Sequence, residues 1–199
     1  MSKTVLFTPG LGEGLATHRP YQDTLQVFED LGYNSHFVPI DWRENDHATS
    51  YDVAAQLREV YDAYKPDVLA GFSFGAIASL CVAAERRPAA VWACSLSAFF
   101  KEDLTPEVIA QLKGDCSPEQ IGSYKSLSFA ALAGRIACPV ELFVGSEECK
   151  RWERIAKRAT TAEKLLPAAR LTIVLGADHD ITAPSYLTAL RDTLPPALD

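Results

Sequence analysis

The sequence from Asp67 to Ala84 reads DVLAGFSFGAIASLCVAA, and this stretch decides the fold. An apolar run, 68–70, leads into Gly71-Phe72-Ser73-Phe74-Gly75, and small and apolar residues then continue at helical length to Arg87 and Pro88. This pattern predicts a buried strand, a sharp turn and a buried helix, with a serine at the turn. Two glycines suit such a turn, because the strand and helix come so close that a Cβ on either side would collide.

A Gly-x-Ser-x-Gly sequence between a strand and a helix is typical of a nucleophile elbow, in which the turn holds a serine hydroxyl above the sheet. Ser73 is therefore the candidate nucleophile. The alternative is that Ser73 is an ordinary turn residue of a catalytically silent protein that binds a ligand on the same scaffold.

The size and charge of the chain narrow the class of protein. The 199 residues fit one domain, 1–199, with a single sizeable core, and 48% hydrophobic with 23% charged residues is typical of a soluble globular protein. The net charge of -7 argues against a nucleic-acid partner, which would require a basic patch. The largest basic cluster is Lys150, Arg151 and 154–158, which we expect to be a solvated helix face.

Membrane and metal-binding signals are weak in this sequence. The uncharged run 68–84 is shorter than the roughly 20 apolar residues of a membrane span, so we expect no membrane partner. The start, MSKTVLFTPG, has a run of apolar residues far shorter than the roughly 7 to 15 of an export signal, which favours a cytoplasmic protein. The 5 cysteines are odd in number and lack paired spacing, so we expect neither a disulfide framework nor a metal site.

Apolar runs and helical patterns alternate along the rest of the chain. Besides the strand before Ser73, strands are expected at 4–8, 35–40, 89–95, 140–144 and 171–175, and Thr49 with Asp52 predicts a capping box for the helix that follows. This alternation predicts an α/β fold with three layers and a doubly wound, mainly parallel six-stranded sheet. Ligands of such sheets bind outside the carboxyl ends of the strands, where Ser73 is expected.

An insert at 99–136 separates the fourth and fifth strands. Helix starts are expected at Thr105 and Ser117, each followed by proline, and a third short helix is expected at 127–133. The insert is a candidate small helical cap over the site. Because it is rich in apolar residues, with Tyr124 and Phe129 available, we expect an apolar pocket of modest size beneath it.

A serine nucleophile needs an imidazole to accept its proton and a carboxylate to orient that imidazole. His179 follows the last strand and is the only histidine C-terminal to Ser73. The acid is expected between them in the chain order serine, acid, histidine. Glu148 and Glu147 follow the fifth strand, and Asp103 follows the fourth, so all three are candidates.

With these motifs the chain resembles the α/β-hydrolase superfamily across almost its full length, as a small single-domain serine hydrolase without the N-terminal antiparallel strands of larger relatives. The glycine-x-x-acid pattern of that family's acid loop falls on Glu148, although many members have aspartate there, and Glu147 lies one residue away. Asp103 matches a position that some lipase-like relatives use.

The resemblance also implies an oxyanion hole. One donor is expected to be the backbone N–H of Phe74, at the positive end of the helix after Ser73. The second is expected in the loop after the first strand, where Pro9-Gly10-Leu11 stands in place of the family's His-Gly-x. The Leu11 N–H is our expectation, with Gly12 as the alternative.

What the resemblance implies is cleavage of a small-molecule carboxylic ester or thioester through an acyl-enzyme on Ser73, with no metal or organic cofactor. Acyltransferase, peptidase or lyase chemistry on the same residues stays open. A dinucleotide cofactor is disfavoured, because the third glycine of a Gly-x-Gly-x-x-Gly motif that starts at Gly10 would fall on Leu15.

Overall fold

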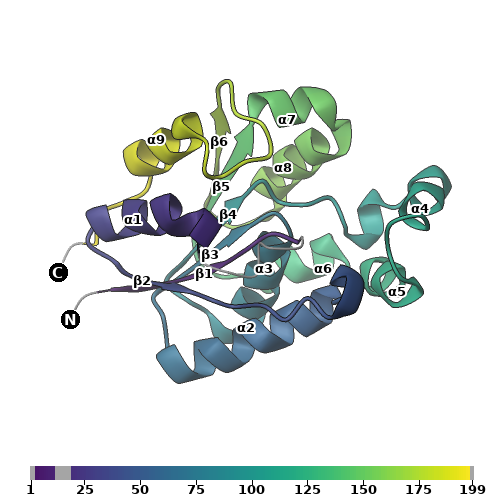
Figure 1. Ribbon diagram of the computed structural model, residues 1–199, viewed down its shortest axis with the longest axis horizontal. Helices are drawn as coiled ribbons and strands as arrows, with labels where there is room; N and C mark the ends of the chain where they lie inside the picture. The colour runs from purple at the N-terminus through teal and green to yellow at the C-terminus, as the bar shows by residue number, and fades with distance from the viewer. Residues whose placement is uncertain (1–2, 12–18, 198–199) are drawn as a thin grey trace.

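Six parallel strands form one sheet in the order β2-β1-β3-β4-β5-β6 within residues 3–11 and 19–197, which the computed structural model describes (Figure 1). Every neighbouring pair is parallel. The strands are β1 (Thr4–Thr8), β2 (Asn34–Phe37), β3 (Val68–Phe72), β4 (Ala90–Cys94), β5 (Val140–Gly145) and β6 (Ala169–Val174). The strand order reverses between β1 and β3, as a doubly wound sheet requires.

Helices cover both faces of the sheet and give the three predicted layers (Figure 1). Buried residues of α1 (Gln22–Asp30) and α9 (Pro184–Thr193) share one apolar cluster with one face of the sheet. The other cluster joins the opposite face to α2 (Ser50–Tyr64), α3 (Phe74–Arg86) and α8 (Glu153–Leu165). The sheet thus lies between two layers of helices.

The central unit runs from β3 through Ser73 into α3. All five residues of β3 are buried, and so is α3 from Phe74 to Ala83. The helix ends where Arg87 adopts a left-handed conformation with φ 54°, directly before Pro88. Among the described helices, none combines the length and the apolar composition that crossing a membrane needs.

The predicted capping box is present, and a second one forms at the predicted helix start at Ser117. Thr49 Oγ1 accepts a hydrogen bond from the N–H of Asp52, and the Asp52 carboxylate accepts one from the Thr49 N–H at the start of α2. Ser117 and Gln120 make the same pair of bonds at the start of α5.

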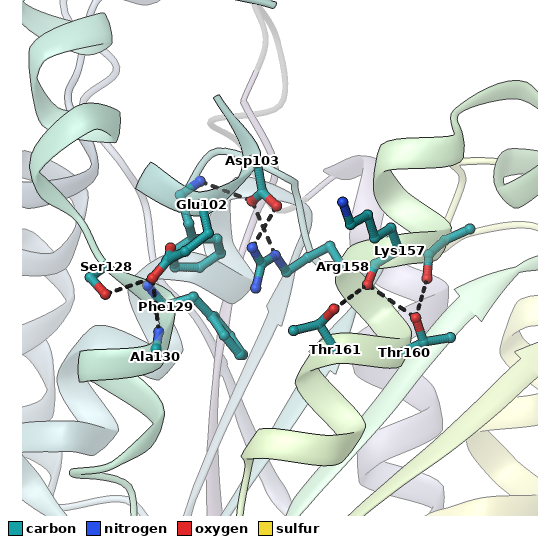
Figure 2. Close-up of polar contacts among 11 residues, drawn as sticks. Glu102, Asp103, Ser128, Phe129, Ala130, Lys157, Arg158, Thr160 and Thr161 are labelled. Carbon is teal, nitrogen blue, oxygen red and sulfur yellow. Dashed lines mark hydrogen bonds and ion pairs between the residues drawn. The ribbon is translucent and has the colours of Figure 1, made fainter. Parts of the chain in front are cut away.

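The segment 99–136 forms short helices between β4 and β5. They are the 3₁₀ turn Lys101–Asp103, α4 (Pro106–Leu112), α5 (Pro118–Ser126) and α6 (Phe129–Ala133), and Figure 1 shows α4 and α5 at the right-hand end of the molecule. The third helix begins two residues later than expected, because Ser128 caps it by accepting from the Ala131 N–H. Glu102 adds acceptors for the N–H groups of Phe129 and Ala130 (Figure 2).

Arg158 corrects the expectation of a solvated basic face. Its guanidinium donates to Asp103 through Nε at 3.0 Å and Nη2 at 2.5 Å, and the two side chains are only 3% and 8% exposed (Figure 2). The guanidinium also lies over the rings of Phe100 and Phe129. Burial is tolerated because an acid pairs with the charge and aromatic faces cover it. This ion pair fastens the segment 99–136 to α8.

Candidate active site

Ser73 occupies a strained turn at the carboxyl end of β3. Its φ of 54° and ψ of −113° lie outside the common regions for a residue with a side chain, and its N–H donates to the carbonyl of Cys94 at 2.8 Å. A Cβ at Gly71 would overlap the carbonyl of Gly75, and one at Gly75 would overlap the carbonyl of Thr8. Close packing of β1, β3 and α3 therefore holds this conformation in place.

His179 bridges Ser73 and Glu148. Its Nε2 lies 2.9 Å from Ser73 Oγ, and its Nδ1 lies 3.1 Å from Glu148 Oε2. When Nδ1 carries the proton and donates to the carboxylate, Nε2 accepts from the serine hydroxyl. The structure thus brings together three side chains that follow β3, β5 and β6 at one edge of the sheet.

Glu148 lies on a helix that the sequence pattern did not reveal, α7 (Ser146–Arg151). The residue is fully buried, and its Oε2 also accepts from the Ser95 hydroxyl at 2.8 Å. Ser95 in turn lies 3.1 Å from the hydroxyl of Tyr186, which therefore donates to it. Burial raises the pKa of Tyr186, so this hydroxyl keeps its proton. Two hydroxyls in series thus support the carboxylate from behind.

The other two candidate acids lie elsewhere. Glu147 is half-exposed, binds Lys150 at 2.7 Å and accepts from Ser146. Asp103 is committed to Arg158. Of the three acids weighed from the sequence, Glu148 is the one that contacts His179.

The loop that carries His179 is bound to the start of α7. The Gly176 N–H donates to Ser146 Oγ and the Glu147 N–H donates to the Ala177 carbonyl, both at 2.9 Å. A Cβ at Gly145 would overlap that same carbonyl, so the close approach needs a glycine. The acid and the histidine are therefore fixed to each other by main-chain contacts as well as by their side chains.

Aromatic rings contact the imidazole, and the two flanking aspartates bind groups other than the ring. The ring of Phe72 lies 4.8 Å from it, and Trp152 meets it edge-on at 5.6 Å. Asp178 accepts from the His179 N–H and pairs with Arg151, while Asp180 accepts from Thr182. The two aspartates that flank His179 thus have structural partners, and neither replaces Glu148.

Ser97 is a neighbour of Ser73 that sequence reasoning missed. The two hydroxyl oxygens lie 2.9 Å apart and are both buried. When Ser73 donates to His179, its oxygen can accept from Ser97. The available signal was position alone, because Ser97 follows β4, which lies beside β3 in the sheet.

A cavity of about 220 Å³ opens onto Ser73 and His179. Its wall comes from the segment after β4 and from the start of α8, with the residues Ser97, Ala98, Phe99, Trp152, Arg154 and Ile155. Phe99 stacks on Tyr124 with ring centres 4.9 Å apart, so Tyr124 supports the wall from behind. Phe129 packs against Phe100 and Arg158 and is not part of the wall, contrary to the expectation.

Of the expected oxyanion donors, Phe74 directly follows Ser73, and Leu11 lies in the loop after β1. Phe74 is the first residue of α3, so its N–H lies at the positive end of that helix. A Cβ at Gly10 would lie 3.2 Å from the Cβ of Ser73, so the loop after β1 passes beside the serine, and half-buried Leu11 follows it. The Gly10 N–H donates to the hydroxyl of Tyr21, which leaves Leu11 as the candidate in the described part of this loop. Gly12, the alternative, lies outside the described residues.

The buried thiols of Cys81 and Cys94 are poor nucleophile candidates. Burial raises the pKa of the Cys81 thiol to about 12 and also raises the pKa of the Cys94 thiol, so both stay protonated and weakly nucleophilic at neutral pH. Within residues 3–11 and 19–197, no three His, Cys, Asp or Glu side chains are grouped so that they could hold a metal ion.

No protein-family model and no curated protein matches this sequence. Solved structures do match. Est1E from Butyrivibrio proteoclasticus has a TM-score of 0.75 at 16% identity, covering 96% of this chain and 86% of its own. Dienelactone hydrolase from Anabaena variabilis has a TM-score of 0.64 at 20% identity, covering 96% of this chain and 82% of its own. MenH from S. aureus has a TM-score of 0.67 at 15% identity, covering 94% of this chain and 91% of its own. Coverage is nearly complete while identity is low, so the likeness shows a shared fold.

Proposed function

We propose that this chain, which has the α/β-hydrolase fold, is a serine hydrolase that cleaves a carboxylic ester or thioester. One observation carries the proposal: the hydrogen bonds that run from Ser73 Oγ through His179 to buried Glu148. The names of the structural neighbours, which include a dienelactone hydrolase and a carboxylesterase from Bacillus subtilis, support the same class of reaction.

Acylation begins at the turn after β3, which we interpret as a nucleophile elbow. Ser73 Oγ attacks the substrate carbonyl carbon while His179 Nε2, 2.9 Å away, takes the hydroxyl proton. The tetrahedral intermediate collapses, the bond to the leaving oxygen or sulfur breaks, and His179 returns the proton to the leaving group. Water then attacks the acyl-enzyme, with His179 as its base, and releases the acid and free Ser73.

Glu148 stabilises the imidazolium that forms in each half of the reaction. Its contact with Nδ1 sets the tautomer in which Nε2 can accept the serine proton. Full burial strengthens this interaction, because little solvent screens the carboxylate.

We assign the stabilisation of the negative charge that develops on the carbonyl oxygen to hydrogen bonds from the N–H groups of Phe74 and Leu11. Phe74 offers its donor at the positive end of α3, and Leu11 belongs to the loop beside Ser73. A pair of such donors is needed, since the loss of one typically lowers the rate by about 10² to 10³.

The segment 99–136 is proposed to act as a small cap within a single domain. Phe99 forms part of the cavity wall, and the Asp103–Arg158 ion pair ties the segment to α8, whose first turn also contributes to that wall. The cap would thus limit the size of the substrate.

A fluorophosphonate probe tests the proposed nucleophile. We expect covalent labelling at Ser73, located by peptide mass spectrometry, and loss of labelling in His179→Ala. His36→Ala is the matched control, because His36 contacts Asn34 and Tyr64 away from the site and should leave labelling unchanged. A folded wild-type protein that takes no label, or labelling that persists in His179→Ala, would contradict the proposal.

A pH profile tests the base. The rate of ester hydrolysis should fall as the solution is acidified, because a protonated imidazole cannot accept the serine proton. A value of kcat/KM that stays constant from pH 8 to pH 4 would remove His179 from this role.

A further inference from the structure

Three arginines at 151, 154 and 158 lie on α7 and α8, and two of them are paired with acids. Arg151 binds Asp178, and Arg158 binds Asp103. Arg154 lies between them and has no acid partner among the described residues, and its Nη1 atom is buried without a hydrogen-bond partner there. The chain has 26 acidic against 19 basic residues, so a shortage of acids does not explain this. A partly buried, unpaired guanidinium is costly unless something else binds it.

Arg154 belongs to the wall of the cavity that holds Ser73 and His179. The other described wall residues are apolar or carry a hydroxyl, an indole or an imidazole, so Arg154 is the one permanently charged residue among the described lining residues. The carboxylate of Glu148 lies behind the imidazole and is already bound by His179 and Ser95. None of the described lining residues is an acid that could neutralise Arg154.

The start of α8 adds to the positive potential. The helix has 13 residues, begins at Glu153 and has no side-chain N-cap. Trp152, Arg154 and Ile155, which contribute to the cavity wall, all lie at this N-terminal end. The Ile155 N–H in this turn donates to the Trp152 carbonyl at 2.9 Å. The N–H groups of the first two residues of the helix can attract an anion, and they lie beside Arg154, which has no acid partner among the described residues. The side chain of Glu153, in the same turn, is exposed.

We propose that Arg154 binds an ionised carboxylate of the substrate, so that the substrate is an ester or thioester bearing a second, free acid group. This inference rests on the proposed hydrolase function. The planar guanidinium matches a carboxylate with two parallel hydrogen bonds. The cavity of about 220 Å³ is smaller than a drug-sized site, which favours a short molecule. Arg154 thus acts as a specificity residue that orients the acid group while Ser73 attacks the ester.

Matched substrates test this charge recognition. One pair places the charge on the alcohol side, 4-acetoxybenzoate against 4-acetoxybenzamide. The other places it on the acyl side, monoethyl adipate against the ethyl ester of adipamic acid. In at least one pair, we expect wild-type kcat/KM to be about 10-fold or more higher for the anion, as a charge-assisted hydrogen bond allows.

Substitution of Arg154 should remove that preference. Arg154→Met should lower kcat/KM for the favoured anion by about 10- to 100-fold, mainly through KM, and change the neutral partner less than about threefold. The kcat/KM of Arg154→Lys for the favoured anion should lie between those of wild type and Arg154→Met, because lysine keeps the charge and loses the two parallel hydrogen bonds of the guanidinium. Lys157→Met is the matched control: it removes an exposed positive charge from α8 outside the cavity wall and should leave both substrates unchanged. Thermal unfolding checks that each variant is folded.

Binding gives a readout that does not depend on turnover. In Ser73→Ala, calorimetry should detect adipate or 4-hydroxybenzoate, the acid-bearing product of the favoured pair. Adding Arg154→Met should weaken that affinity at least about 10-fold. Neutral adipamide should bind no better with Arg154 than without it.

The outcomes separate the two claims. Equal wild-type rates for both members of each pair, or a preference that survives in Arg154→Met, would overturn the role of Arg154 and leave the proposed hydrolase intact. If no ester is cleaved, the proposed function fails and calorimetry still decides: carboxylate binding that requires Arg154 supports the anion site, and its absence rejects it.

Discussion

Ser95 donates a hydrogen bond to Oε2 of Glu148 at 2.8 Å, the same oxygen that contacts Nδ1 of His179. Ser95 directly follows β4 and has a left-handed φ of 48°, which points to tight constraint by its surroundings. Behind it, Tyr186 donates to the Ser95 hydroxyl. Hydrogen bonds from the protein interior thus orient the Glu148 carboxylate toward the imidazole of His179.

The first prediction concerns the acid itself. Glu148→Gln should lower kcat for ester hydrolysis by about 10³ to 10⁴, because the amide favours the wrong imidazole tautomer. Glu147→Gln is the neighbouring control and should change kcat less than about twofold, since Glu147 faces Lys150. Initial-rate assays of ester hydrolysis on folded variants measure kcat. Equal effects of the two substitutions would contradict the assignment of Glu148 as the acid.

Ser95 is predicted to act as a positioning residue. Ser95→Ala removes one donor from buried Glu148, so we expect kcat to fall about 10-fold with KM nearly unchanged and stability to drop by about 1 to 3 kcal/mol. Tyr186→Phe removes the next hydroxyl in the series and should act in the same direction with a smaller effect. If Ser95→Ala lost stability and left kcat unchanged, its role would be structural only.

The Asp103–Arg158 pair makes a stability prediction. Asp103→Ala should lower the free energy of unfolding by about 3 to 5 kcal/mol, because it leaves a buried guanidinium without its acid. The double variant Asp103→Leu with Arg158→Met should lose less, since neither charge remains. Urea unfolding followed by circular dichroism measures both, and the idea fails if the double variant is the less stable of the two.

Glu102 predicts a pH-dependent contribution. Burial alone would raise its pKa, but hydrogen bonds from Ser128 and from the N–H groups of Phe129 and Ala130 outweigh burial and lower it (Figure 2). The folded state thus favours the ionised form, so the stabilisation is present above the unfolded pKa of about 4.3 and is lost as the pH falls through the lower folded value.

Glu102→Gln should therefore cost about 0.5 to 1 kcal/mol at pH 7, the low end for a helix-capping group because Glu102 is exposed. The difference from wild type should shrink below pH 4. Unfolding at several pH values measures it. Glu163→Gln, exposed in the last turn of α8, should show little difference at any pH. A cost for Glu102→Gln that grew on acidification would have the wrong sign.

Gly71→Ala is expected to prevent or severely weaken folding. The new methyl group would overlap the backbone of Gly75, which cannot move away without displacing α3. We expect a loss of more than about 4 kcal/mol, at the severe end for single substitutions. Gly122→Ala is the control: nothing lies within 4 Å of its Cβ position inside α5, so a small gain in stability should follow. Thermal melts of the two variants decide the matter, and similar melting temperatures would refute it.

Elements with a strong local signal were predicted well from the sequence. β1 has the expected bounds, and the helix starts at Thr105 and Ser117 depend on capping residues that act within one turn. The α/β sheet followed from apolar runs that alternate with helical patterns. These features are local, so a single sequence contains them.

Features set by distant partners were predicted poorly. The sequence of α7, SEECKR, has no apolar periodicity, and its contacts with the loop after β6 appear only in three dimensions. β6 is an edge strand that runs from Ala169 to Val174, whereas the apolar run predicted 171–175. The last apolar residue of that run, Leu175, is exposed and lies outside the strand. Burial of Arg158 depends on Asp103, 55 residues away.

The candidate site shows the same division. Chain order and strand ends nominated Ser73 and His179 and left three acids open, of which the family resemblance favoured Glu148. The structure brings Ser73, His179 and Glu148 into contact. Their catalytic roles stay predictions. Ser95, Ser97 and Arg154 lacked a motif, because ordinary serines and arginines gain a role only through the side chains that surround them.

The hydrogen bonds between α7 and the loop 176–177 couple the position of the acid Glu148 to that of the imidazole of His179. A displacement of α7 together with this loop would move both side chains in the same direction, against the hold of Ser95 on Glu148, while Ser73 stays anchored to the central strands. The contact between Ser73 Oγ and His179 Nε2 would then be the first of the hydrogen bonds in this series to lengthen. A bound ligand that contacts both residues would restore their alignment.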